Sequence, residues 1–155
     1  SNLYGQQSIL TMALKDIHFF SEDIAFTLKE KQKVREWINQ TIKNEDFIRV
    51  AELNFIFCSD EYLLTINKQY LDHDTYTDIV TFDSSEEEDI IAGDIFISID
   101  RIRENAEKFA VAERDELHRV IIHGVLHLCG YYDKKKEDKA LMTQKEDQYL
   151  KARSF

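Results

Sequence analysis

The order of apolar and polar positions predicts amphipathic helices separated by short apolar strands. Residues 30–43 place apolar side chains at spacings of three and four among charged residues, which is typical of a surface helix. Residues 51–58 alternate at first and then become continuously apolar, which is typical of a central strand. Residues 111–129 leave little polar face, so this longer helix is expected to be buried.

Three further segments have the composition of strands. Weak alternation at 13–20 and β-branched residues at 77–82 and 93–98 predict extended structure. The acidic stretch 84–89 predicts an exposed turn, so the two segments that flank it are expected to pair antiparallel. Helices and strands are interspersed without a repeat or linker, which predicts an α+β domain with a small mixed four-stranded sheet.

Residues that favour helix N-termini predict where two of the remaining helices begin. Ser59 and Asp60 favour the start of a short helix that ends near Leu71, and Asp100 is expected to cap a helix that runs to about residue 110. The final helix, 136–151, is expected to turn three apolar residues inward: Leu141, Met142 and Leu150.

Length and charge limit the classes of protein that the chain can represent. Its 155 residues are enough for one domain with a real core, and we expect a single domain over 1–155, with Ser1 and Asn2 as a tag remnant. A net charge of −10 argues against broad adhesion to nucleic acid. The sequence has no apolar run long enough for a membrane span and no secretory pattern in its first residues, so we expect neither. Two isolated cysteines, Cys58 and Cys129, fit a reducing cytoplasm.

One stretch carries metal-binding chemistry. His123 and His127 lie four residues apart, so on a helix their side chains share one face. Gly130 offers a left-handed helix end, after which the chain can bring Asp133 back towards the two imidazoles. Two nitrogens and one carboxylate oxygen with an open fourth position form the ligand set of a catalytic zinc. The structural alternative is a pair of buried histidines that are merely hydrogen-bonded to neighbours.

The same spacing also occurs in zinc peptidases. Those enzymes place a glutamate directly after the first histidine as general base. Here that position is Gly124, which cannot transfer a proton, so the sequence disfavours peptidase activity.

Several segments together resemble one family. In the expected order and spacing the chain carries Thr-Asp-Ile-Val-Thr-Phe at 77–82, Gly-Asp-Ile-Phe-Ile-Ser at 93–98 and His-Gly-Val-Leu-His-Leu-Cys-Gly-Tyr at 123–131. With Glu116-Leu117 and residues 67–70, these segments resemble the YbeY family of bacterial rRNA maturation factors. The resemblance covers about residues 45–150, and the histidine-containing string is its specific part.

The resemblance implies a zincin-like α+β fold and a zinc-dependent, single-strand-specific endoribonuclease. It also implies roles in 16S rRNA 3′-end maturation and ribosome quality control. His123 and His127 match the first two zinc ligands of the family, whereas Asp133 stands where the third histidine is usual. Carboxylate oxygen is an acceptable zinc ligand. After Tyr70 the family usually has an arginine, and here the residue is Leu71.

Other charged residues offer weaker candidates. Lys134, Lys135 and Lys136 follow the third ligand, either as an electrostatic funnel for RNA or as a solvated loop. Glu116 is seven residues before His123, and two helical turns favour a structural role for it. Four arginines are further candidates, but the sequence does not determine whether their side chains point towards the site: Arg101, Arg103, Arg114 and Arg119. Three histidines have no second candidate ligand at a metal-binding spacing, so no metal-binding or catalytic role is predicted for them: His18, His73 and His118.

A non-catalytic function competes with the nuclease. An acidic surface suits a basic ribosomal protein, so the chain could be an assembly factor that binds rRNA or the ribosome with a structural metal. Chelation separates the two functions, because loss of a structural metal lowers the melting temperature sharply whereas loss of a catalytic one abolishes cleavage. The sequence leaves the oligomeric state open.

Overall fold

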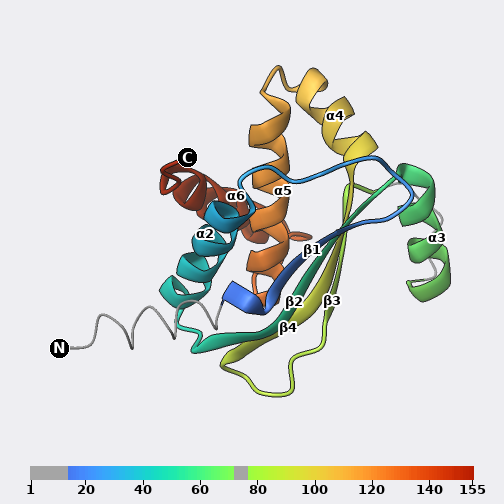
Figure 1. Ribbon diagram of the computed structural model, residues 1–155. Coiled ribbons are helices and arrows are strands. Elements are labelled where there is room, and N and C mark those ends of the chain that lie inside the picture. Colours follow the sequence, from blue (N-terminus) through green and yellow to red (C-terminus); the bar gives the residue numbers. More distant parts are fainter. Residues whose placement is uncertain (1–13, 72–76) are drawn as a thin grey trace.

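A four-stranded mixed sheet forms the centre of the computed structural model, which describes residues 14–71 and 77–155 (Figure 1). The strand order is β1-β2-β4-β3, in which β1, β2 and β4 are parallel and β3 is antiparallel to β4. The strands are β1 (Ile17–Ser21), β2 (Arg49–Cys58), β3 (Ile79–Asp83) and β4 (Ile90–Ser98).

Helices cover both faces of this sheet unequally. Helix α5 contacts β3, β4, α2, α4 and α6, whereas α3 packs on β3, β4 and α4. Figure 1 shows α2 and α6 beside α5 and shows α3 at the opposite side of the sheet. The helices are α2 (Lys31–Asn44), α3 (Asp60–Tyr70), α4 (Ile99–Lys108), α5 (Glu113–Leu128) and α6 (Lys136–Lys151).

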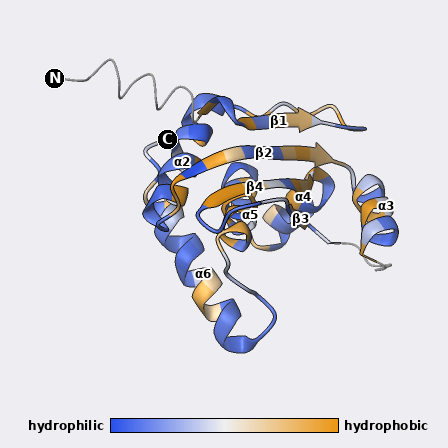
Figure 2. Ribbon diagram, turned by 90° about the horizontal axis from the view of Figure 1, so that it is seen from below, coloured by the Kyte–Doolittle hydropathy of each residue, from blue (hydrophilic) through white to orange (hydrophobic). Residues whose placement is uncertain are grey.

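The alternation of β4 divides the core into two clusters. Ile95 and Ile97 are fully buried in the larger cluster, which includes α2, α5 and Met142 of α6. Phe96 points to the opposite face and packs with the smaller cluster beneath α3. Figure 2 shows the hydrophobic colour concentrated on the strands, while α2 and α6 are largely hydrophilic. The sheet therefore anchors α5 through the face that carries most of the buried apolar surface.

Gly124 allows α5 to lie close to the sheet. A Cβ at this position would lie 2.8 Å from Cδ1 of Ile79 and 3.0 Å from Cγ2 of Ile95. These separations are shorter than ordinary carbon contacts, so even a methyl group at this position would require the side chains of Ile79 and Ile95 to shift. The helix that carries His123 is thus seated directly against the sheet.

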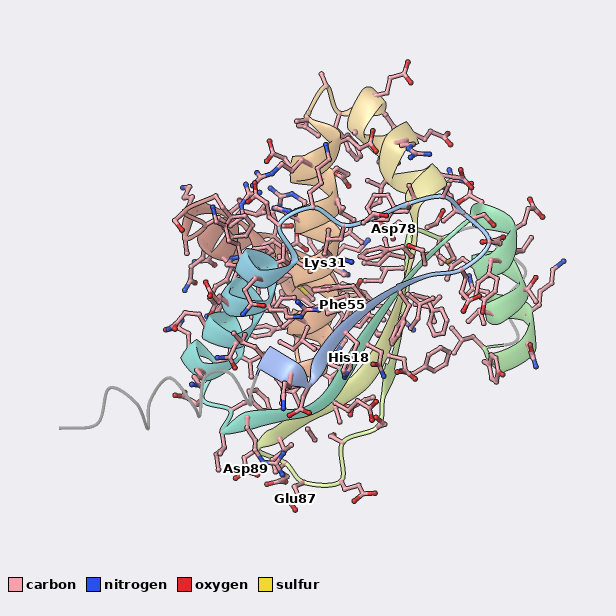
Figure 3. The ribbon with its side chains drawn as sticks, in the orientation of Figure 1. His18, Lys31, Phe55, Asp78, Glu87 and Asp89 are labelled. Atoms are coloured by element: carbon pink, nitrogen blue, oxygen red, sulfur yellow. The ribbon has the colours of Figure 1, made fainter. Side chains whose placement is uncertain are left out.

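The structure confirms the α+β class, the mixed four-stranded sheet and the antiparallel β3–β4 pair. The acidic turn is exposed, and Figure 3 shows Glu87 and Asp89 at the end of the sheet away from Asp78. The predicted bounds of α6 are also confirmed. Within the described ranges, no helix combines the length and the apolarity needed to cross a bilayer.

Several local predictions were wrong. The strand predicted at 13–20 starts at Ile17, because the described residues Leu14 and Lys15 are helical. The cap of α4 is Ser98, whose hydroxyl accepts from the backbone N–H of Arg101 at 3.1 Å, so the prediction for Asp100 fails. Asp100 instead accepts from the backbone N–H of Asp60 at 2.9 Å. Leu141 is exposed rather than inward.

A buried histidine ties α5 to the end of the chain. The ring centroid of His118 lies 5.5 Å from that of Trp37 and 5.4 Å from that of Phe155. Its Nδ1 accepts a hydrogen bond from the Arg153 guanidinium at 2.7 Å, so the ring is neutral. Burial and the positive charges of Arg153 and Arg114 lower the pKa of His118 to about 4.

Acidification is therefore expected to destabilise the fold through His118. Its folded pKa of about 4 lies below the ordinary value of 6.5, so the unfolded chain binds more protons as the pH falls between these values. From pH 7 to pH 5 the free energy of unfolding should fall by about 2 kcal/mol more in the wild type than in His118→Phe. Urea unfolding of both proteins at both pH values measures this difference, and equal losses would contradict it.

Candidate metal centre

The end of α5 and the turn after it bring three ligand side chains together. His123 and His127 lie one turn apart with their ring centroids 4.5 Å from each other. Gly130 takes a φ of 102°, the left-handed conformation that the sequence predicts, and its N–H donates to the His127 carbonyl at 3.0 Å. The chain then reverses, and Asp133 lies opposite the two rings.

The three side chains converge on one point. Oδ2 of Asp133 lies 3.2 Å from Nε2 of His123 and 3.1 Å from Nε2 of His127. All three ligand atoms lie within 4.8 Å of one another, which makes them a candidate metal-binding group. The side chains are partly exposed, at 19%, 22% and 37% for His123, His127 and Asp133, so solvent reaches the group from one side.

Each imidazole is held from its outer nitrogen. Nδ1 of His123 lies 2.6 Å from Oε2 of Glu146, and Nδ1 of His127 lies 3.0 Å from the Tyr131 carbonyl oxygen. An ionised carboxylate and a carbonyl oxygen only accept, so both Nδ1 atoms carry protons and donate. In both rings Nε2 is therefore the atom that a metal can bind.

Glu146 was not identified from the sequence. It is 7% exposed and lies on the buried face of α6, four residues after Met142. Its Oε1 accepts from Arg119 at 2.9 Å, and the same guanidinium donates to the more exposed Asp147 at 2.8 Å. One feature of the sequence could have identified Glu146. It is an acidic residue four positions after Met142, so it lies on the helix face that is otherwise apolar and buried.

The electrostatic field of the site extends to Asp78. Burial alone would lower the pKa of His123, but the Glu146 hydrogen bond and the charges of Glu146, Asp133 and Asp78 outweigh burial and raise it. Burial raises the pKa of Asp78, against the favourable charge of His123. Asp78 precedes β3 and belongs to the motif at 77–82, where the sequence alone assigned it no role.

A second group of side chains fixes the turn. Tyr131 and Tyr149 donate from their hydroxyls to Glu45, and Nζ of Lys145 donates to Glu45 at 3.3 Å. Burial alone would raise the pKa of Glu45, but these hydrogen bonds lower it. Tyr131, whose carbonyl holds His127, is thus anchored to α6 through the partly buried carboxylate of Glu45.

The donor set fits a divalent transition metal. Tetrahedral zinc with bonds of about 2.0 to 2.1 Å separates its ligand atoms by about 3.3 Å, close to the 3.1 and 3.2 Å found between Asp133 and the two histidines. Two imidazoles and one carboxylate are ligands that zinc accepts, and partial exposure leaves a fourth direction open. Glu146 and the Tyr131 carbonyl supply the outer hydrogen bonds that metal-binding histidines require.

The predicted lysines lie next to the three candidate metal ligands, whereas most of the other charged candidates lie elsewhere. Lys134, Lys135 and Lys136 are exposed directly after Asp133: Lys135 is the N-cap of α6, and Lys136 is its first residue. Leu71 caps the C-terminus of α3 and is 39% exposed. Each of the four candidate arginines pairs with an acidic residue, and among these four Arg119 contacts the site through Glu146.

Glu116 and the unassigned histidines occupy separate positions. Glu116 is buried, and burial together with the charge of Asp78 raises its pKa. His18 lies on β1, and His118 packs with the C-terminal residues. His73 lies outside the described residues.

Comparisons with known proteins agree with the motif pattern. The model of the family described as Endoribonuclease YbeY matches residues 16–154. A relative of that name from Cytophaga hutchinsonii is 51% identical over 144 residues, covering 93% of this chain and 100% of the relative. Another from Flavobacterium psychrophilum is 50% identical over 132 residues, covering 85% and 93%.

A solved structure gives the same result. The solution structure of TM1509 from Thermotoga maritima matches with a TM-score of 0.61 at 29% identity, covering 87% of each chain. Both the sequence and the fold therefore agree with the resemblance carried by the motifs. This chain belongs to the Endoribonuclease YbeY family.

Proposed function

We propose that this chain is a metal-dependent endoribonuclease that cleaves single-stranded RNA, with zinc held by His123, His127 and Asp133. The observation that carries the proposal is the convergence of Oδ2 of Asp133 on both Nε2 atoms in a chain of this family. Residues 1–155 would form a single hydrolase domain. Gly124 follows the first histidine where peptidases place their glutamate, so the absence of that general base disfavours peptide substrates.

The side chains of the site have separable tasks. A divalent metal supplies charge neutralisation at the phosphate and lowers the pKa of a water that it binds. His123 and His127 present Nε2 because their Nδ1 protons are held by Glu146 and the Tyr131 carbonyl. Asp133 contributes the negative charge that the usual third histidine would not. Burial raises the pKa of Asp78, and the charges of Asp78 and His123 interact favourably.

The biological substrate that we propose is rRNA, in 16S 3′-end maturation and ribosome quality control in the cytoplasm. Membership of the family supports an RNA substrate. The net charge of −10 suits contact with basic ribosomal proteins while the ribosome presents the RNA strand.

Chelation tests the proposal against the assembly-factor alternative. Zinc-loaded protein should cut a single-stranded rRNA fragment and leave a matched duplex intact, and a chelator should abolish the cut until zinc is restored. The melting temperature should change by only a few degrees, because the core clusters form without the three ligands. Intact RNA with metal-loaded protein, or a collapse of the fold upon chelation, would favour the binding factor.

The lysines after Asp133 are proposed to hold the RNA backbone. Lys134, Lys135 and Lys136 are exposed beside the site, and Leu71 offers no charge at the position where the family usually has arginine. Replacing all three lysines by alanine should raise KM with little change in kcat. The salt dependence of log KM should weaken by about 0.7 for each phosphate that the variant no longer neutralises.

A matched triple substitution controls for the loss of charge. Lys29, Lys31 and Lys33 are exposed in α2 and the loop before it, away from the β3 side of the sheet. Alanine at these three positions should leave KM and its salt dependence unchanged. Equal effects of the two triple variants would show that only net charge matters.

A further inference from the structure

We infer that Glu146 is a positioning residue that fixes the orientation of His123 and thereby sets the metal affinity of the site. This inference rests on the proposed metal-dependent function. It assigns to the C-terminal helix α6 a task in the metal centre, although the three ligands come from α5 and the turn after it.

The two oxygens of Glu146 have different partners. Oε2 lies 2.6 Å from Nδ1 of His123, and Oε1 lies 2.9 Å from Nη1 of Arg119. Arg119 and His123 are four residues apart, so both project from the same face of α5 towards α6. Because both oxygens are engaged, the plane of the carboxylate is fixed, and so is the direction in which it holds the imidazole.

Burial makes this arrangement specific to Glu146. The side chain of Glu146 is 9% exposed. The neighbouring Asp147, which pairs with Nη2 of Arg119, is 49% exposed. A buried charge needs both a counter-charge and hydrogen bonds, and Arg119 with His123 supplies them. The Asp147 pair is an exposed ion pair of the kind that contributes little.

The consequence for the metal concerns preorganisation. A histidine ring that can rotate must be ordered when the ion binds, whereas a ring held at Nδ1 already presents Nε2. The other ring, His127, is held by a backbone carbonyl, which no side-chain substitution removes directly. Glu146 is therefore the side chain through which the orientation of a ligand can be altered while all three ligands remain.

The test compares three variants by their zinc dissociation constants, measured in competition with a chromophoric chelator. Glu146→Ala should raise the dissociation constant by about 10- to 100-fold. Glu146→Gln should raise it less, because the amide oxygen still accepts from Nδ1. Asp147→Asn removes the same charge from the adjacent residue and should stay within about twofold of wild type.

A spectroscopic measurement separates positioning from general stability. At saturation with Co²⁺, the visible absorption of Glu146→Ala should differ from that of wild type, because the ligand geometry has changed. Asp147→Asn should reproduce the wild-type spectrum. A role limited to packing α6 would lower the melting temperature of the metal-free protein without changing the spectrum or the affinity of folded molecules.

The outcomes discriminate between the claims. A folded Glu146→Ala protein with wild-type zinc affinity would overturn this inference alone. If that variant does not fold, Glu146→Gln decides, and an affinity equal to that of Asp147→Asn would be fatal to the inference. Wild-type protein that binds no zinc would instead overturn the proposed function and this inference with it.

Discussion

Alanine in place of His123 should weaken zinc binding and RNA cleavage by about two orders of magnitude. Structural zinc sites with four ligands bind with about 10 to 16 kcal/mol, so each ligand contributes roughly 3 kcal/mol, or about 100-fold in affinity. At zinc concentrations near the wild-type dissociation constant, the cleavage rate should fall in the same proportion. Metal content after dialysis and the rate of cleavage of a single-stranded rRNA fragment measure both effects.

The matched control is another histidine-to-alanine substitution. His18 lies on β1, the edge strand opposite β3, and Figure 3 shows it well separated from Asp78. His18→Ala, purified in the same way, should keep full metal content and cleavage, and loss of cleavage in His123→Ala alone would exclude a contaminating nuclease. If His123→Ala still cleaved at the wild-type rate, the zinc group would not be the catalytic centre.

The convergence of the three candidate ligands could be predicted because their geometry is local. His123, His127 and Asp133 lie within eleven residues, and one helical turn and one glycine turn determine how they meet. Glu146 could not be predicted in the same way, because its contact with His123 depends on how α6 packs against α5. The RNA-binding role of the lysines stays a prediction.

The fold shows the same division between local and tertiary causes. The helical spacing of apolar residues predicted α2 and α6 closely, since an amphipathic face is visible in the sequence alone. The start of β4 was placed at Gly93, three residues late, because Ile90 and Ile91 become strand by pairing in parallel with Arg49 and Val50 of β2. Such pairing joins segments that lie far apart in the chain and leaves no local signal.

Gly93→Ala should cost about 3 kcal/mol of folding free energy and lower the melting temperature by about 10 °C. A Cβ at Gly93 would lie 2.4 Å from the carbonyl oxygen of Phe82 on β3 and 3.2 Å from both methyl groups of Leu128 on α5. The carbonyl belongs to the backbone and cannot rotate away as a side chain would. Relief therefore requires β3 to separate from β4, where Gly93 pairs with Asp83. Thermal unfolding of the metal-free protein measures the effect.

Gly124→Ala is the control for this substitution, because its new methyl group would meet only side-chain ends. Cδ1 of Ile79 at 2.8 Å and the methyl groups of Ile95 at 3.0 and 3.1 Å can shift by small rotations. Alanine also gains about 1 kcal/mol over glycine within a helix, which offsets part of the crowding. The melting temperature of Gly124→Ala should therefore fall by much less than that of Gly93→Ala. Equal losses would show that the backbone contact at Phe82 is not what makes Gly93 necessary.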